Sequence, residues 1–351
     1  MTRRPRNRPV RHHIVTEAYL RRFSDAGKVM VVRRGMEPFE SSVRNVAVET
    51  NFYLYGDRRA PLWFEEMLAR VEAEAMPAFR RLLTSFPPSA QDRAAISLYL
   101  GLQRVRGPDF RECYQQLHAL SHQRDYEWLT PRFERIVTAA NEGATLAELT
   151  RDLQDLHIVP SLDSLTAIRL YLEDHEAFRA PPGQDEALRA AAVLGPHLCA
   201  QVSGLRWRIY SWPEPVLVTS DRPVTVVRRE DPFLDHVVFP VDSCHALALF
   251  QIGEDGQFEG TDKLSRAFNK HSLKWAFRSL FYRPGLALAS AVVDEFQATP
   301  DPSYLDDPVV AAIIQSTLTS VNAGAMSDEE ILLGGWLADG EPIADRANDL
   351  N

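Results

Sequence analysis

Cysteine is scarce in this 351-residue chain, and its three cysteines, Cys113, Cys199 and Cys244, stand far apart without any paired spacing. A disulfide framework and a cysteine-ligated zinc site both require grouped cysteines, so neither is expected. The sequence also has no apolar run of the length of a signal peptide or a membrane span. We therefore expect a protein of the cytoplasm that does not enter a membrane.

Positive charge is also limited, since 39 Lys and Arg face 48 Asp and Glu and the net charge is -9. A surface that binds nucleic acid mainly by neutralising phosphates needs an excess of basic residues, so an extensive surface of this kind is not expected. Five arginines among residues 3–11 form a local basic segment, which we interpret as a solvated arm. The chain has no G-x-S-x-G nucleophile motif and no Walker motif, which leaves serine nucleophiles and phosphate loops without support.

The composition, 45% hydrophobic and 25% charged, is typical of a globular protein with a large core. We predict an α+β fold with a predominantly helical body, a short N-terminal strand pair and a small antiparallel sheet from the middle-to-late chain. Residues 1–60 would form an N-terminal arm, a His-His helix and short strands. Residues 61–203 would form the helical body, and residues 204–351 the sheet with C-terminal helices. We expect these three parts to form one interlocked unit of unknown oligomeric state.

Apolar periodicity and turn signals give the expected positions of the individual elements. Helices are expected at residues 16–23, 61–86 with a kink at Pro77, 89–106, 188–202 with a kink or break at Gly195-Pro196, 264–281 and 309–321. Strands are expected at residues 28–34, 51–57, 206–212, 216–219, 224–227, 236–240 and 246–251. The stretch Pro181-Pro182-Gly183 has the composition of a linker.

The adjacent histidines His12 and His13 directly precede the first expected helix. Side chains of neighbouring residues on an extended segment point to opposite sides, so this pair is not expected to chelate one ion together. One imidazole would face the interior as a metal ligand or as an acid or base. The alternative is that both are structural.

Four more residues suit a polar site. Glu65 and Glu72 are seven residues apart on one helix and so lie on nearly the same side, about 10 Å apart along its axis. Arg106 lies where Gly107-Pro108 interrupts the next helix, and its guanidinium could hold a carboxylate or phosphate in a bidentate fork. Asp221 follows an apolar strand directly. Each has a structural alternative: helix-rim carboxylates, an Arg106 pair with Glu65 or Glu72 across two packed helices, and an Asx-turn cap at Asp221.

The order of these landmarks resembles a largely bacterial family, domain of unknown function 4238. The resemblance spans most of the chain and rests on His12-His13-Ile14-Val15, Tyr19-Leu20-Arg21-Arg22-Phe23, Val46 to Tyr53, the helix of Glu65 and Glu72, Arg106 to Arg111, Val218 to Val224, Phe239-Pro240 and Asn269. The chain departs from the family pattern at Thr16-Glu17-Ala18, where Pro-Gln-Phe is common, and at Gly107, where Thr is usual. The resemblance implies which positions matter and implies no reaction.

We weigh three functions for this set of residues. The first is a metal-dependent hydrolase, with a phosphodiester or another small molecule as substrate and with Mn, Zn or Fe as the ion. In it His12, His13 and Arg106 would be catalytic, and His13, Glu65, Glu72 and Asp221 would hold the ion. The second is a non-catalytic binding or interaction protein, in which the same residues form a buried polar network. The third is an iron-dependent oxygenase with histidine and carboxylate ligands.

Overall fold

The computed structural model describes residues 11–56, 62–116, 135, 138, 183–227, 236–286, 288 and 290–298. Its internal contacts divide the chain into two compact units, residues 1–113 together with 184–351, and residues 114–183. The second boundary directly follows Pro181-Pro182-Gly183, the stretch with the composition of a linker. The fold is α+β, as the sequence predicts, and the first unit contains both sheets and the long helices.

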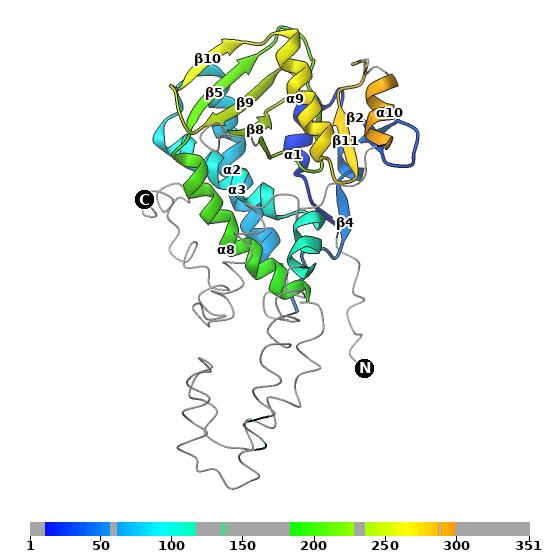
Figure 1. Ribbon diagram of the computed structural model, residues 1–351, viewed down its shortest axis with the longest axis vertical. Helices are drawn as coiled ribbons and strands as arrows, with labels where there is room; N and C mark the ends of the chain where they lie inside the picture. The colour runs from blue at the N-terminus through cyan, green and yellow to red at the C-terminus, as the bar shows by residue number, and fades with distance from the viewer. Residues whose placement is uncertain are drawn as a thin grey trace, which may run out of the picture. The chain divides into compact units, whose positions relative to one another are not determined.

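Three long helices form the helical part of this unit, α2 (Trp63–Thr84), α3 (Ala90–Val105) and α8 (Gln184–Ser203) (Figure 1). The helix α8 approaches α3 closely, because a Cβ atom at Gly101 would lie 2.2 Å from the carbonyl oxygen of Gly195. Only glycine permits this distance between the two backbones. The helix α8 continues through Gly195-Pro196 without a break, and α2 continues past Pro77.

The interruption after α3 is confirmed. The helix ends at Val105, Arg106 and Gly107 form a bend, and residues 108–116 are helical again. A Cβ atom at Gly107 would lie 2.1 Å from Oδ1 of Asp109, so a larger residue at this position would displace the Asp109 side chain. Arg106, in the bend, and Asp109, just after it, are both buried.

The later part of the chain forms a five-stranded sheet with the strand order β10-β5-β9-β8-β7 (Figure 1). Its strands are β5 (Arg206–Ser211), β7 (Thr225–Val227), β8 (His236–Pro240), β9 (His245–Phe250) and β10 (Gly256–Glu259). Four of them pair antiparallel, as predicted, whereas β10 pairs with β5 in the parallel direction. The sheet is therefore mixed at the β10 edge.

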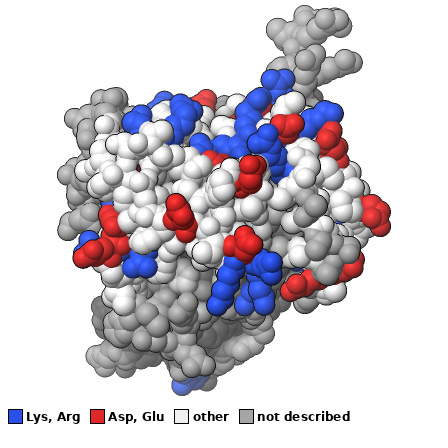
Figure 2. Space-filling model, turned by 90° about the horizontal axis from the view of Figure 1, so that it is seen from above, with Lys and Arg blue, Asp and Glu red and all other residues white. Residues whose placement is uncertain are grey.

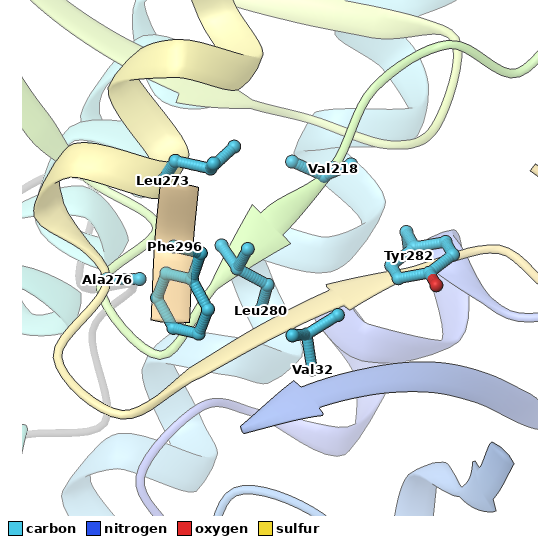
Figure 3. Packing of buried hydrophobic residues seen from close by; sticks show 7 residues of the cluster. All are labelled: Val32, Val218, Leu273, Ala276, Leu280, Tyr282 and Phe296. Atoms are coloured by element: carbon cyan, nitrogen blue, oxygen red, sulfur yellow. The ribbon is translucent and has the colours of Figure 1, made fainter. Parts of the chain in front are cut away.

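A second sheet joins the beginning of the chain to its later part. It has four antiparallel strands in the order β3-β2-β11-β6: β3 (Phe39–Ser42), β2 (Lys28–Arg33), β11 (Ser279–Tyr282) and β6 (Thr219–Ser220). Helices α9 (Asp262–Trp275) and α10 (Ser290–Ala298) contribute to the core of this region. Figure 3 shows that core, which consists of Val32, Val218, Leu273, Ala276, Leu280, Tyr282 and Phe296.

Two expected elements differ from the prediction. The helix expected at residues 264–281 stops at Trp275, and its last part is the fully buried strand β11, which pairs with β2 and β6 on its two sides. The strand expected at residues 51–57 is instead β4 (Val48–Thr50), because Asn51 has a left-handed φ of 56° that ends it. The helix expected at 309–321 lies outside the described residues.

The first helix is confirmed as α1 (Glu17–Leu20) followed by the 3-10 turn η1 (Arg21–Phe23). The side chain of Thr16 accepts a hydrogen bond from the backbone N–H of Tyr19 and so caps α1. The hydroxyl of Tyr19 donates to the carbonyl of Pro240 at 2.6 Å, which fixes α1 to the five-stranded sheet. Burial raises the pKa of Tyr19 well above its ordinary value, so the hydroxyl stays protonated.

Among the described helices, none combines the length and the apolar character that crossing a bilayer requires. Figure 2 shows one face of the molecule, on which the basic side chains gather in separate groups with acidic side chains beside them.

Candidate functional site

The N-terminal strand β1 (Arg11–His13) carries both histidines and pairs antiparallel with β4, with His12 opposite Glu49. Alternation along the strand buries His12 completely, whereas Arg11 is exposed and His13 is half-buried. The ring of His12 packs edge-to-face against Tyr53, with 5.3 Å between the ring centroids. The two imidazoles therefore occupy different environments, as the sequence predicts for neighbours on a strand.

A pocket of about 410 Å³ lies beside this strand and collects four of the predicted residues. Its lining consists of His13, Thr16, Glu17, Ala18, Arg21, Tyr53, Glu65, Leu68, Ala69, Glu72 and Arg106. His12 is outside the lining, but its Nδ1 lies 3.2 Å from Oε2 of Glu65. The structure thus brings together His13, Glu65, Glu72 and Arg106 and places His12 against one of them.

Arg106 fixes the N-terminal segment to the helices. Its Nη1 donates to Oε1 of Glu72 at 2.7 Å, its Nη2 donates to the carbonyl of His13 at 2.6 Å, and its Nε donates to the hydroxyl of Tyr53 at 3.1 Å. Burial lowers the pKa of Arg106, but Tyr53 and Glu72 outweigh this effect and hold the pKa above its ordinary value. The pair that the sequence predicts across two packed helices is therefore Arg106 with Glu72.

The same segment has further anchors on α3. Nε2 of Gln103 donates to the carbonyl of Ile14 at 3.1 Å, and the hydroxyls of Thr16 and Tyr99 are 3.2 Å apart. Both pairs are buried, so each satisfies polar groups that have little access to water. Residues 13–16 are consequently held along one wall of the pocket.

The three carboxylates of the pocket differ in their partners. Glu17 pairs with Arg21 at 2.5 Å and with Arg44 at 3.5 Å, and Glu72 pairs with Arg106. Glu65 has no guanidinium partner within the described part of the chain, and its side chain is 38% exposed. Among the described residues it forms a pair only with the imidazole of His12.

Both histidines have a pKa below the ordinary value of an imidazole. Burial lowers the pKa of His12, and the neighbouring Glu65 only partly offsets this. Burial also lowers the pKa of His13, with Glu17 acting in the opposite direction and Arg106 adding to the decrease. Near pH 7 both imidazoles are therefore neutral, with one nitrogen lone pair each.

Asp221 is not part of the pocket lining. Its carboxylate accepts hydrogen bonds from the backbone N–H groups of Phe277 (2.8 Å), Arg278 (2.7 Å) and Ser279 (2.9 Å), which hold the segment leading into β11. Burial raises its pKa to about 6, against the effect of these hydrogen bonds. The structural alternative for Asp221 was an Asx-turn cap. The structure shows a structural role through backbone groups more than 50 residues away instead.

The predicted ion ligands are not gathered around one point. Within the described residues, the structure has no group of three or more His, Cys, Asp or Glu side chains arranged to hold a metal ion. Asp221 lies instead beside Arg222, whose Nε donates to Oδ2 of Asp109 in a pair that is almost completely buried.

Sequence reasoning missed Tyr53, Glu17 and Arg21 as members of the pocket. Glu17 and Arg21 have the i, i+4 spacing of a helical ion pair, which was a usable signal. Tyr53 lies in a turn after β4, and its contact with Arg106 spans 53 residues, so local pattern gives no indication of it.

The residues of the pocket lie within the part of the chain that matches a known protein family. A family model described as "Protein of unknown function (DUF4238)" matches residues 11–285, a range that includes every residue of the pocket lining. No curated protein and no solved structure matches the chain.

Proposed function

The chain belongs to this DUF4238 family, and from the geometry of the pocket we propose that it is a metal-dependent hydrolase of a phosphodiester or a similarly anionic small molecule. The observation that carries the proposal is Glu65, a partly exposed carboxylate without a guanidinium partner among the described residues, in a pocket that is also lined by the imidazole of His13. The other charges of the pocket are already paired.

Charge balance is the reason for including a divalent ion. An anionic substrate would meet the uncompensated charge of Glu65, so a cation is needed between the two. Ions such as Mn²⁺ bind to one or two carboxylates and take their remaining ligands from water and substrate oxygens. Such an ion needs only one or two ligands from the protein, and the described part of the pocket holds no group of three.

His13 and Arg106 have the properties that the remaining roles require. His13 lines the pocket as a neutral imidazole, and its Nε2 has no hydrogen-bond partner among the described residues. It is our candidate for the base that activates water. Arg106 uses three of its five N–H groups in the hydrogen bonds given above, and the other two have no partner among the described residues and could donate to a phosphate oxygen.

The test uses untagged protein and a panel of single-stranded DNA, RNA and bis(p-nitrophenyl) phosphate, with Mn²⁺, Zn²⁺ or Fe²⁺ or with a chelator. We expect hydrolysis that needs the ion and that falls at least about tenfold in Glu65→Gln. The matched control is Glu66→Gln, an exposed carboxylate one position along the same helix. Its rate should equal that of the wild type. Equal rates for the two variants, at equal melting temperatures, would show that hydrolysis does not depend on the carboxylate of Glu65.

A second function, a non-catalytic binding protein, is favoured by the density of the polar contacts around residues 13–16. Arg106, Gln103 and Tyr99 all hold this segment, so a structural role accounts for them without any reaction. The two functions differ at His13. In a hydrolase His13→Gln should lower the rate about 10²-fold or more, whereas in a binding protein the panel should show no hydrolysis in either form.

A further inference from the structure

His12 is fully buried, and neither of its ring nitrogens has a hydrogen-bond partner among the described residues. A buried polar atom that lacks a partner costs about 1–3 kcal/mol, so such an atom calls for an explanation. The carboxylate of Glu65 is near enough to supply a partner, since its Oε2 is 3.2 Å from Nδ1. The contact nevertheless does not have the geometry of a hydrogen bond.

The same spacing suits two ligands of one ion. Bonds from a transition metal to histidine nitrogen and carboxylate oxygen are about 2.1 Å long, so two donors 3.2 Å apart would subtend an angle of roughly 100° at the ion. This angle lies between the octahedral and the tetrahedral values, about 90° and 109°, which Mn²⁺ and Zn²⁺ adopt. The donors themselves, one imidazole nitrogen and one carboxylate oxygen, are typical of these ions.

The two donors differ in their exposure. Glu65 lines the pocket and is 38% exposed, so its carboxylate is the side of the pair that faces solvent, whereas Nδ1 of His12 is buried behind it. The edge-to-face contact with Tyr53 holds the ring in its orientation.

We infer that Nδ1 of His12 and Oε2 of Glu65 are the two protein ligands of a divalent transition-metal ion, with water and substrate oxygens completing its coordination. The inference rests on the proposed function and changes one assignment that the sequence suggested. The ligand is the buried His12 instead of His13, and His13 remains in the pocket as the base. Glu72 remains paired with Arg106, and Asp221 remains hydrogen-bonded to the backbone N–H groups that donate to it.

The experiment is calorimetric titration of untagged, chelator-treated protein with MnCl₂ or ZnCl₂ alone, together with elemental analysis of the protein after dialysis. We expect one ion per chain in the wild type and an affinity at least about tenfold weaker in Glu65→Gln. The variant Glu66→Gln should keep the wild-type affinity. His12→Gln should lose the ion. Because His12 is buried, this change can also impair folding, and in that case the affinity of Glu65→Gln decides the test.

His13→Gln separates this inference from the proposed function. It should retain the ion while losing hydrolysis. Binding of one ion without hydrolysis of any substrate would support the ligand pair and reject the hydrolase. Hydrolysis that continues in chelator would reject the ligand pair and leave a hydrolase. The absence of stoichiometric binding in the wild type, or equal affinities in Glu65→Gln and Glu66→Gln, would overturn the inference.

Discussion

Two buried arginines, Arg106 and Arg222, both pair with carboxylates, but their surroundings differ in access to solvent. The pocket cluster, defined here as His12, His13, Glu65, Glu72 and Arg106, borders a cavity, and Glu72 keeps 24% of its side chain exposed. The sealed cluster, defined as Asp109, Asp221 and Arg222, has no member exposed by more than 6%. Similar residue types thus serve a candidate site in one place and a structural junction in the other.

The two clusters differ in whether each carboxylate has a partner within the protein. In the sealed cluster every carboxylate is used by the protein itself, by Arg222 or by backbone N–H groups. In the pocket cluster Glu65 is 38% exposed and has no guanidinium partner among the described residues. A functional site is therefore better recognised by the group that the fold leaves uncompensated than by the density of charged residues.

The largest effect should come from breaking the sealed pair. Arg222→Met leaves the buried Asp109 without its counter-charge, and we expect a loss of about 3–5 kcal/mol in the free energy of unfolding. Urea denaturation measures it. The double variant Arg222→Met with Asp109→Leu should recover much of this loss, because it removes both charges. Failure of the second change to restore stability would mean that the pair is not the source of the effect.

The second effect concerns pH. The folded pKa of Asp221, about 6, lies above its ordinary value of 3.8, so between these values the native state keeps a proton that the unfolded chain has released. Stability from this group is therefore greatest at low pH and is lost as the pH rises through 6, on the order of 3 kcal/mol in total.

Asp221→Asn isolates this contribution from that of the histidines, whose lowered pKa values act in the opposite direction. The stability difference between wild type and variant should shrink from pH 4 to pH 7. A difference that stays constant or grows would show that Asp221 is already ionised throughout.

A smaller loss is expected on the pocket side. Arg106→Met removes three hydrogen bonds, but Glu72 can turn to water, so we expect about 2 kcal/mol. The same urea series measures the change. A loss as large as that of Arg222→Met would remove the contrast between the two clusters.

The smallest effect separates two glutamates on α2. Glu65→Gln should change stability by less than about 1 kcal/mol, because its charge is partly solvated and has no guanidinium partner among the described residues. Glu72→Gln should cost about 1–2 kcal/mol through its bond to Arg106. Thermal unfolding of both variants compares them, and the reverse order would show that Glu65 is the structural residue of the two.

Local pattern was enough to predict much of the fold and part of the site. The spacing of apolar residues predicted α2, which buries one face. The apolar content of residues 188–202 predicted α8, and a β-branched run predicted β2. The seven-residue spacing of Glu65 and Glu72 and the break after Arg106 likewise predicted side chains that the structure places around one pocket.

The rest depended on contacts between distant segments. The strand β11 is buried on both faces and shows no alternation, so its sequence resembles the end of a helix. Asp221 has the local sequence of a site residue, yet its partners are backbone groups at residues 277–279. His12 and His13 are equivalent in sequence, and only the pairing of β1 with β4 decides which is buried.

We propose that a metal ion binds at Glu65 and not at Asp221. The most direct measurement is an anomalous difference map from crystals of the protein soaked in MnCl₂. We expect one peak within about 2.1–2.3 Å of both Nδ1 of His12 and Oε2 of Glu65. A peak between Asp221 and Asp109, with none beside Glu65, would contradict it.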